Sequence, residues 1–316
     1  MCGLFGFINY SGKKIKDLAD LTNSLAEQAA VRGTDATGIA FSGYSDVKIM
    51  KESKSAYRMD IKHSDDIIAL IGHTRHSTQG SEKRNYNNHP FHGKCRNSKF
   101  ALAHNGVLSN DKELRKKYNL PRTKIETDSY IAVQLIESQN YLNFDSIKYT
   151  AEKTEGSFSY SILDDKNNIW LVKGDSPLSI LHFPKLKIYV YASTDEILYK
   201  ALVDYPLLFK SLKNGEFEDV KISEGDILKI RPDGVIEKKT FEYSYYYGRG
   251  WWDYGSYTSI SLGNVKSGYT KNDYIDDLNS IASYQGYSPE EVDMLLANGF
   301  SPEEVEEYIY CMAGEV

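Results

Sequence analysis

Short segments with the pattern of β-strands recur through most of this 316-residue chain, and they constrain its fold more than any other feature. Between residues 2 and 241 these segments alternate apolar and polar side chains or are rich in β-branched and aromatic residues. The predicted strands are 4–8, 37–42, 71–76, 99–104, 157–163, 168–173, 178–183, 187–192, 226–231 and 235–241. Apolar residues at helical spacing predict helices over 15–29, 111–118 and 127–139. We therefore expect residues 2–241 to form one domain of mixed α and β structure.

The composition changes sharply after residue 241. Residues 243–269 read YSYYYGRGWWDYGSYTSISLGNVKSGY, in which glycine, serine and aromatic residues dominate and aliphatic residues are few. Such a composition favours a linker over residues 242–271, partly packed on the main domain through its tryptophans. A strip that becomes ordered on a partner protein is the alternative.

Residues 272–316 are predicted to form a small acidic helical unit. The pentapeptide Ser-Pro-Glu-Glu-Val occurs at 288–292 and again at 301–305. Each copy places serine at the N-cap, proline at the first helical position and glutamate at the third, which is a capping box. A further helix is expected at 273–284. The stretch LLANGFSPEEVEEYI, 295–309, resembles the three-helix ubiquitin-associated type of domain, which implies tethering, and a structural cap is equally open.

Composition and charge exclude several classes of protein. The three cysteines, Cys2, Cys95 and Cys311, are odd in number and far apart, so we expect no disulfide framework and a reducing cytoplasm. No secretion signal is recognisable, and no stretch approaches the ~20 apolar residues of a membrane span. Residues 271–316 hold 11 acidic residues and one lysine. Clustered basic residues and phosphate-binding loop motifs are missing, so neither a nucleic-acid partner nor a nucleotide cofactor is expected.

Cys2 directly follows the initiator methionine. Removal of Met1 would leave a first residue that carries both a thiol and a free α-amine. An α-amine has an unperturbed pKa of about 7.7–8, so it can act as the base for the adjacent thiol near neutral pH. The position alone proves little, because a second-position cysteine is common by chance.

Five motifs accompany this cysteine. They are RGTDATGIA at 32–40, GHTRHSTQG at 72–80, NNHPF at 87–91, HNGVLSN at 104–110 and ETDSYIA at 126–132. In order and approximate spacing, over about residues 2–240, they resemble the glutaminase domain of class II glutamine amidotransferases. These are N-terminal-nucleophile (Ntn) hydrolases, and the similar domains include those of glucosamine-6-phosphate synthase and phosphoribosylpyrophosphate amidotransferase.

The resemblance implies a catalytic group of three residues. Cys2 would attack the side-chain amide of glutamine, and the tetrahedral oxyanion would be held by the Asn105 side chain and the Gly106 backbone N–H. Glycine also allows the backbone to approach the reacting atom closely.

The resemblance also implies a site for the α-groups of glutamine. Arg75 suits the carboxylate through its fork of donors, helped by Thr78, and Asp128 suits the ammonium group. Arg32, Asp35 and His104 are expected to support these residues from behind. Taken singly, an arginine or aspartate is more often an ordinary ion-pairing residue, and Asn-Gly is the commonest turn dipeptide.

Four histidines between residues 73 and 92 offer an alternative, a zinc site. They are His73, His76, His89 and His92. No cysteine or carboxylate accompanies them at a spacing suited to zinc, so we expect neither a metal nor a cofactor. His76 stands where the related domains usually have a large aromatic residue, and Gln79 replaces a histidine of some relatives. The lid over the glutamine pocket is therefore expected to close differently, or to respond to pH.

The fold that the resemblance implies is a four-layer αββα sandwich. Its reaction is the release of ammonia from L-glutamine through a Cys2 thioester. Residues 242–316 are too few for the ammonia-consuming domains of the named enzymes. We therefore expect a separate acceptor enzyme, bound through the 243–269 strip or the acidic helices. Hydrolysis of another amide, as in penicillin or bile-salt acylases, and a non-catalytic adaptor that kept the fold are the alternatives.

Overall fold

A computed structural model of the chain describes residues 2–42, 46–243, 279, 282, 288–297, 300 and 305. The chain divides into two compact units, Met1–Gly248 and Arg249–Val316. The domain boundaries expected from composition, at residues 241 and 271, stay a prediction.

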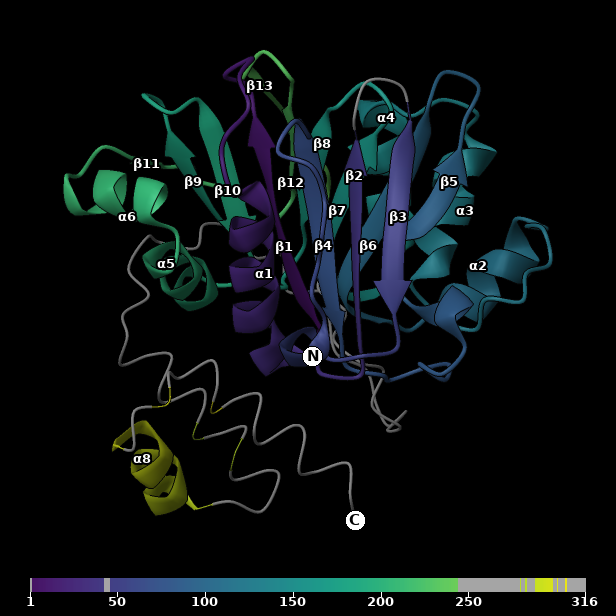
Figure 1. The fold of residues 1–316 in the computed structure, drawn as a ribbon. Coiled ribbons are helices and arrows are strands. Elements are labelled where there is room, and N and C mark those ends of the chain that lie inside the picture. The colour runs from purple at the N-terminus through teal and green to yellow at the C-terminus, as the bar shows by residue number, and fades with distance from the viewer. Residues whose placement is uncertain are drawn as a thin grey trace, which may run out of the picture. The chain divides into compact units, whose positions relative to one another are not determined.

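The first unit is built on two sheets that face each other (Figure 1). Within the described residues, the strand order is β11-β9-β10-β1-β4-β2-β3 in one sheet and β13-β12-β8-β7-β6-β5 in the other. Neighbouring strands in this part of the chain pair antiparallel. The first sheet comprises β1 (Gly3–Asn9), β2 (Ala36–Ser42), β3 (Val47–Glu52), β4 (Ala69–Arg75), β9 (Ser179–Phe183), β10 (Ile188–Ala192) and β11 (Glu218–Asp219). The second comprises β5 (Phe91–Lys94), β6 (Lys99–Leu108), β7 (Gly156–Asp164), β8 (Ile169–Lys173), β12 (Asp226–Ile230) and β13 (Ile236–Thr240).

Strand β1 lies in the middle of the first sheet. Its residue Phe5 is paired with Gly72 of β4 on one side and with Ala192 of β10 on the other. All seven residues of β1 are buried, as its continuous apolar sequence requires. The residue before this strand is Cys2, so the candidate nucleophile is fixed at the end of a central strand.

Helices cover the outer face of each sheet. The first sheet is covered by α1 (Leu18–Ala29), α5 (Asp195–Val203) and α6 (Pro206–Lys213). The second is covered by α2 (Asp111–Lys117), α3 (Tyr130–Ser138) and α4 (Phe144–Lys153). The resulting order of layers, helices, sheet, sheet and helices, confirms the αββα sandwich.

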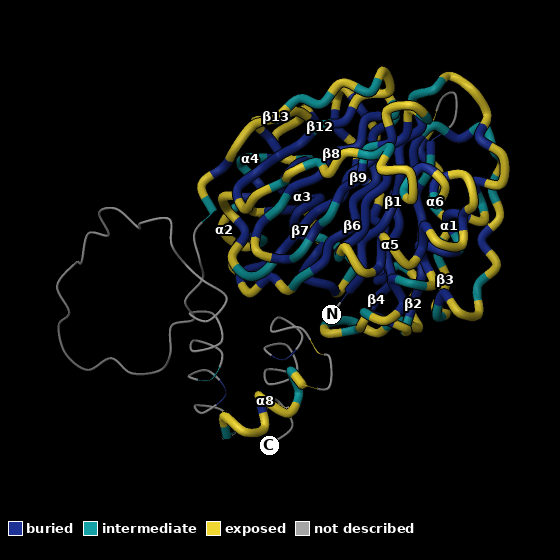
Figure 2. Tube along the Cα trace, turned by 90° about the vertical axis from the view of Figure 1, so that its left-hand side faces the viewer, coloured by how far each residue is buried: buried dark blue, intermediate teal, exposed yellow. Residues whose placement is uncertain are grey.

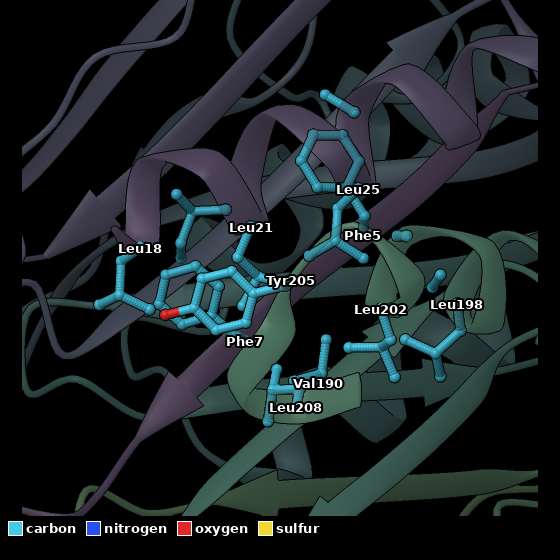
Figure 3. Close-up of a cluster of buried hydrophobic side chains, with 14 of the residues drawn as sticks. Phe5, Phe7, Leu18, Leu21, Leu25, Val190, Leu198, Leu202, Tyr205 and Leu208 are labelled. Carbon is cyan, nitrogen blue, oxygen red and sulfur yellow. The ribbon is translucent and has the colours of Figure 1, made fainter. Parts of the chain in front are cut away.

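Three apolar cores fill the spaces between these four layers. One lies between the first sheet and its helices, where Phe5 and Phe7 of β1 meet Leu21 and Leu25 of α1 and Leu202 of α5 (Figure 3). A second lies between the second sheet and α2–α4, and a third joins the inner faces of the two sheets. The strands are buried along most of their length, whereas the helices expose their outer faces (Figure 2). The sheets are therefore rigid supports for the loops and strand ends that hold the site.

The predicted elements are confirmed with shifted ends, and others were missed. The predicted helix 15–29 begins only at Leu18, because Asp17 has a left-handed backbone with φ of 62°. Strand 99–104 is longer than predicted and continues through Asn105 and Gly106. The missed elements are β3, β5, β11, α4, α5 and α6.

In the second unit the structure describes helix α8 (Pro289–Ala297). The Ser288 hydroxyl accepts the Glu291 N–H at 3.3 Å, and the Glu291 carboxylate accepts the Ser288 N–H at 2.8 Å. This reciprocal pair is the predicted capping box. The second copy of the repeat, the helix predicted at 273–284 and the 243–269 strip lie outside the described residues, apart from a few positions. None of the helices in the described ranges is long and apolar enough to span a bilayer.

Candidate functional site

Cys2 is buried at the start of β1, with 9% of its surface exposed. Its thiol contacts the His76 carbonyl at 3.5 Å, and the Arg32 Nε–H donates to the Cys2 carbonyl at 2.9 Å. Burial raises the pKa of the thiol, while the charge of Arg75 lowers it and that of Asp128 raises it. A cation and an anion thus act on one buried thiol, and Arg32 holds the backbone that carries it.

Residues 33–35, which follow Arg32, pack against and hydrogen-bond to the 75–77 segment, whose His76 carbonyl contacts the thiol. A side-chain carbon built on Gly33 would lie 2.4 Å from the Arg75 carbonyl carbon and 2.5 Å from the His76 nitrogen, so only glycine fits there. The Asp35 N–H donates to the Arg75 carbonyl at 2.9 Å, and its carboxylate accepts the Ser77 N–H at 2.7 Å. Asp35 therefore holds the backbone of the 75–77 segment in place.

Arg75 ends strand β4 and is buried, with 3% exposed. Its Nη1 donates to the Asn88 side-chain oxygen at 2.7 Å, and its Nη2 donates to the carbonyls of Gln79 and Gly80 at 2.8 and 2.6 Å. Burial lowers the pKa of Arg75, and nearby acidic groups, Asp128 among them, oppose that shift. The guanidinium is thus fixed in orientation, with donors left over for a carboxylate.

Asn105 and Gly106 are adjacent on β6 of the opposite sheet. Asn105 is completely buried, and neither its amide nitrogen nor its amide oxygen has a hydrogen-bond partner among the described residues. A buried amide normally finds a partner within the protein, so this one is chemically suited to donate to a ligand. Gly106 has a φ of 132°, and a side-chain carbon there would lie 2.0 Å from the Ser157 carbonyl oxygen. Glycine is therefore required beside Asn105.

Asp128 lies just before helix α3 and is tied to the same strand. Its carboxylate accepts the Leu108 N–H at 2.6 Å and contacts the Ser129 hydroxyl at 3.5 Å. The same hydroxyl is 2.8 Å from Nδ1 of His104, the residue before Asn105. His104 and Ser129 therefore couple the position of the carboxylate to that of the unpartnered amide.

Behind this strand lie two further buried histidines. His73 Nε2 is 2.9 Å from the His104 carbonyl oxygen, and the His73 ring is 4.1 Å from the His89 ring. Burial lowers the pKa of His73 to about 3 and that of His89 well below its usual value, so both are neutral at pH 7. His76 and His92 are exposed instead. Among the described residues, no three histidine, cysteine or acidic side chains are grouped so as to hold a metal ion.

Thr78 stands apart from the other predicted residues, because its side chain is exposed. Its predicted contribution to carboxylate binding stays a prediction. The neighbouring Gln79 anchors the loop by donating from its amide to the Glu126 carbonyl at 2.9 Å.

Two residues of the site, Asn88 and Ser129, were not singled out from the sequence. Both fall inside quoted motifs, NNHPF and ETDSYIA, but no pattern distinguished them from their neighbours. Asn88 orients Arg75, and Ser129 bridges Asp128 and His104. The available signal was that Ser129 directly follows the predicted site residue Asp128 and that Asn88 lies inside a quoted motif.

Comparison with known proteins gives consistent matches. A sequence family described as "Glutamine amidotransferase domain" matches residues 73–200. The glutamine–fructose-6-phosphate aminotransferase (isomerizing) of Staphylococcus epidermidis RP62A is 34% identical over 190 residues, which is 57% of this chain and 30% of that protein. Its Staphylococcus aureus Mu50 counterpart is 33% identical over 187 residues, 56% of this chain and 30% of that protein. The chain thus spans less than a third of the length of these relatives.

Two solved structures share the fold. The glutamine phosphoribosylpyrophosphate amidotransferase from B. subtilis, complexed with ADP and GMP, superposes with a TM-score of 0.58 at 20% identity, covering 77% of this chain and 50% of that one. A structure described as the allosteric regulatory enzyme of purine biosynthesis superposes with a TM-score of 0.59 at 19% identity, with the same coverage. At this level of identity the two structures support the fold alone.

Proposed function

We propose that this chain hydrolyses the side-chain amide of L-glutamine through Cys2. The premise is that it carries a class II glutamine amidotransferase domain. The observation that supports this proposal is a buried thiol that two opposite charges, Arg75 and Asp128, both influence. A cation and an anion act on it, and the opposite sheet carries an amide without a protein partner. Free glutamine has a carboxylate, an ammonium group and a reactive amide, and each has a complementary group here.

The proposed binding step uses the two charges. Arg75 takes the α-carboxylate with the donors that Asn88 and the 79–80 carbonyls leave over, and Asp128 takes the α-ammonium. Thr78 lies on the loop that would close over the carboxylate. These contacts fix glutamine at both α-groups, so the side-chain amide has one orientation relative to the thiol.

The proposed chemistry has two halves. After Met1 is removed, the α-amine of Cys2 takes the thiol proton, and the thiolate attacks the amide carbon. The Asn105 amide and the Gly106 N–H stabilise the oxyanion, and the amine returns the proton to departing ammonia. Water then cleaves the γ-glutamyl thioester to glutamate. Burial raises the pKa of the thiol, so little thiolate is present without a base, and the adjacent α-amine is the base in this proposal.

The partner is a separate proposal. We propose that the ammonia passes to a distinct acceptor enzyme in the cytoplasm, and the support for an acceptor is that the similar Staphylococcus proteins are named aminotransferases. The 243–269 strip or the acidic helices would bind it. Copurification that yields only the single chain, with full glutaminase activity that no added protein changes, would argue against an acceptor.

The test of the function is an intact mass of the purified protein with and without a diazoketone analogue of glutamine, beside a glutaminase assay. We expect loss of Met1, one adduct, and ammonia release from glutamine. Cys2→Ala should remove both the adduct and the activity. Cys95→Ala is the matched control, because Cys95 is also a buried free thiol whose pKa burial raises, to about 11, and it lies away from this site. Retained Met1, or labelling that persists in Cys2→Ala, would overturn the proposal.

A further inference from the structure

Asn88 provides the one side chain among the described residues that accepts a hydrogen bond from Arg75, beside the Gln79 and Gly80 carbonyls. Its side-chain oxygen accepts from Arg75 Nη1 at 2.7 Å. Its side-chain nitrogen donates to the Glu82 carbonyl at 2.8 Å and to the Ser53 and Asn85 side chains at 3.2 Å each. The Asn88 amide is thus held in one orientation, with its oxygen facing the guanidinium.

The backbone of this segment is held by Lys51, which comes from a different strand. Lys51 Nζ donates to the Asn88 carbonyl at 2.5 Å and to the Pro90 carbonyl at 3.0 Å, and it lies 5.1 Å from the centre of the Phe91 ring. Strand β3 is at the edge of the sheet, next to β2, so the lysine reaches the 88–90 segment across the neighbouring strand.

The packing around Gly38 of β2 makes this reach possible. A side-chain carbon on Gly38 would lie 2.1 Å from the His89 carbonyl oxygen and 2.7 Å from the Lys51 Cβ. Because Gly38 has no side chain, both the aliphatic part of Lys51 and the backbone of residues 88–90 can pack against its Cα. The contact between Lys51 and this segment is part of the packed structure rather than a surface ion pair.

We propose that Lys51 is a positioning residue for glutamine binding: it holds the Asn88–Pro90 backbone, and through Asn88 it sets the guanidinium of Arg75 that receives the α-carboxylate. The proposal rests on the proposed function, since it concerns the affinity of that same site. Lys51 itself contacts no reacting group. Its loss should therefore weaken binding of glutamine and leave the chemical step unchanged.

The charged and titratable groups near Lys51 give the proposal a pH signature. They are Arg75 on β4, the neutral His73 and His89, and His92 on β5. Burial, with a smaller effect of the Arg75 charge, lowers the pKa of Lys51 to about 8. As the pH rises through about 8, the lysine loses its charge, which weakens its hold on the two carbonyls and reduces the positive potential at Arg75. Both effects weaken carboxylate binding.

The test compares Lys51→Met and Lys51→Arg with wild type in glutaminase assays at pH 7 and pH 9.5. Lys48→Met is the matched control, because Lys48 lies on the same strand with an exposed side chain. At pH 7 we expect the KM for glutamine to rise roughly tenfold in Lys51→Met with kcat within about twofold, and to stay near wild type in Lys51→Arg and Lys48→Met. From pH 7 to pH 9.5 the KM of wild type should rise more than that of Lys51→Arg, whose charge persists. Glutamine's own ammonium group titrates equally in every variant, so the comparison between variants isolates Lys51.

The outcomes separate the two proposals. If wild type releases no ammonia from glutamine, the proposed function fails. If wild type is active but Lys51→Met has an unchanged KM, or loses kcat instead, the role of Lys51 is refuted. Should Lys51→Met not fold, the comparison of Lys51→Arg with wild type decides alone, because identical pH profiles of KM would refute the inference.

Discussion

Replacing Asn105 with alanine should reduce catalysis strongly without reducing stability. Removal of one oxyanion donor lowers kcat by about 10²–10³, or about 2.7–4 kcal/mol. A buried polar group without a partner costs about 1–3 kcal/mol in the folded state. Since neither polar atom of Asn105 has a partner among the described residues, alanine removes that cost and offsets the small cavity it leaves. We therefore expect the free energy of unfolding to change by less than about 1 kcal/mol, or to increase.

Asn87 provides a matched comparison for stability, because both asparagines are completely buried. The Asn87 side chain donates to the Ser81 carbonyl at 3.1 Å and to the Glu126 carboxylate at 2.8 Å, and it accepts the Glu126 N–H at 2.9 Å. Asn87→Ala breaks all three hydrogen bonds, one of them to a carboxylate, and leaves a cavity at a completely buried position. We expect it to lower the free energy of unfolding by about 2–4 kcal/mol.

The assay is urea unfolding of both variants beside steady-state glutaminase kinetics at pH 7. The expected pattern is a slow but stable Asn105→Ala and a destabilised Asn87→Ala. If Asn105→Ala were as destabilised as Asn87→Ala, the amide would have a structural partner, and the reasoning would fail. A kcat within tenfold of wild type would equally refute its assignment as an oxyanion donor.

Three further predictions follow from the packing and the pKa shifts. Alkylation of Cys2 by iodoacetamide should still accelerate as the pH rises above 9, because burial raises the thiol pKa, and mass spectrometry at several pH values checks this. Lowering the pH from about 6.5 towards 3 should destabilise the protein through His73. The pKa of His73 in the folded state, about 3, lies below its value in the unfolded state. Between these two values the unfolded state binds more protons, so acid favours unfolding. His73→Gln should reduce that pH dependence by up to one proton in urea titrations, and an unchanged slope would contradict it. Gly33→Ala should lower kcat/KM by at least about tenfold, because its methyl group displaces the Arg75–His76 backbone, and activity equal to wild type would show that the backbone yields.

The sequence predicted the elements in which apolar residues follow one clear period. Strand β1 is apolar throughout and was recognised, as were the central strands β7 and β8. Edge strand β3 was missed because its sequence, VKIMKE, carries three charged residues, of which Lys48 and Glu52 lie at exposed positions. Helix α4 was missed because FDSIKYTAEK has few apolar residues, although the Asn143–Ser146 capping box marks its start.

The site could be predicted only as far as the resemblance reached. The resemblance named Cys2, Arg75, Asn105 and Asp128, whereas no periodicity in the sequence relates Arg75 on a strand of one sheet to Asn105 on a strand of the other. Lys51 lay beyond prediction for another reason. Its contact with the 88–90 segment depends on the order of strands in the sheet and on the absence of a side chain at Gly38, and neither can be read from neighbouring residues.

The central position of β1 has a consequence for how the protein matures on the ribosome. Its two neighbours are β4 and β10, and the second of these is complete only at Ala192. At a synthesis rate of about 5–20 residues per second, the first strand waits roughly 10–40 s for its last partner to be translated. During that interval β1 lacks one of the two neighbours with which it pairs in the finished sheet. The order of strands therefore delays completion of the first sheet until translation has passed residue 192, and the apolar side chains of β1 lack their second neighbour until then.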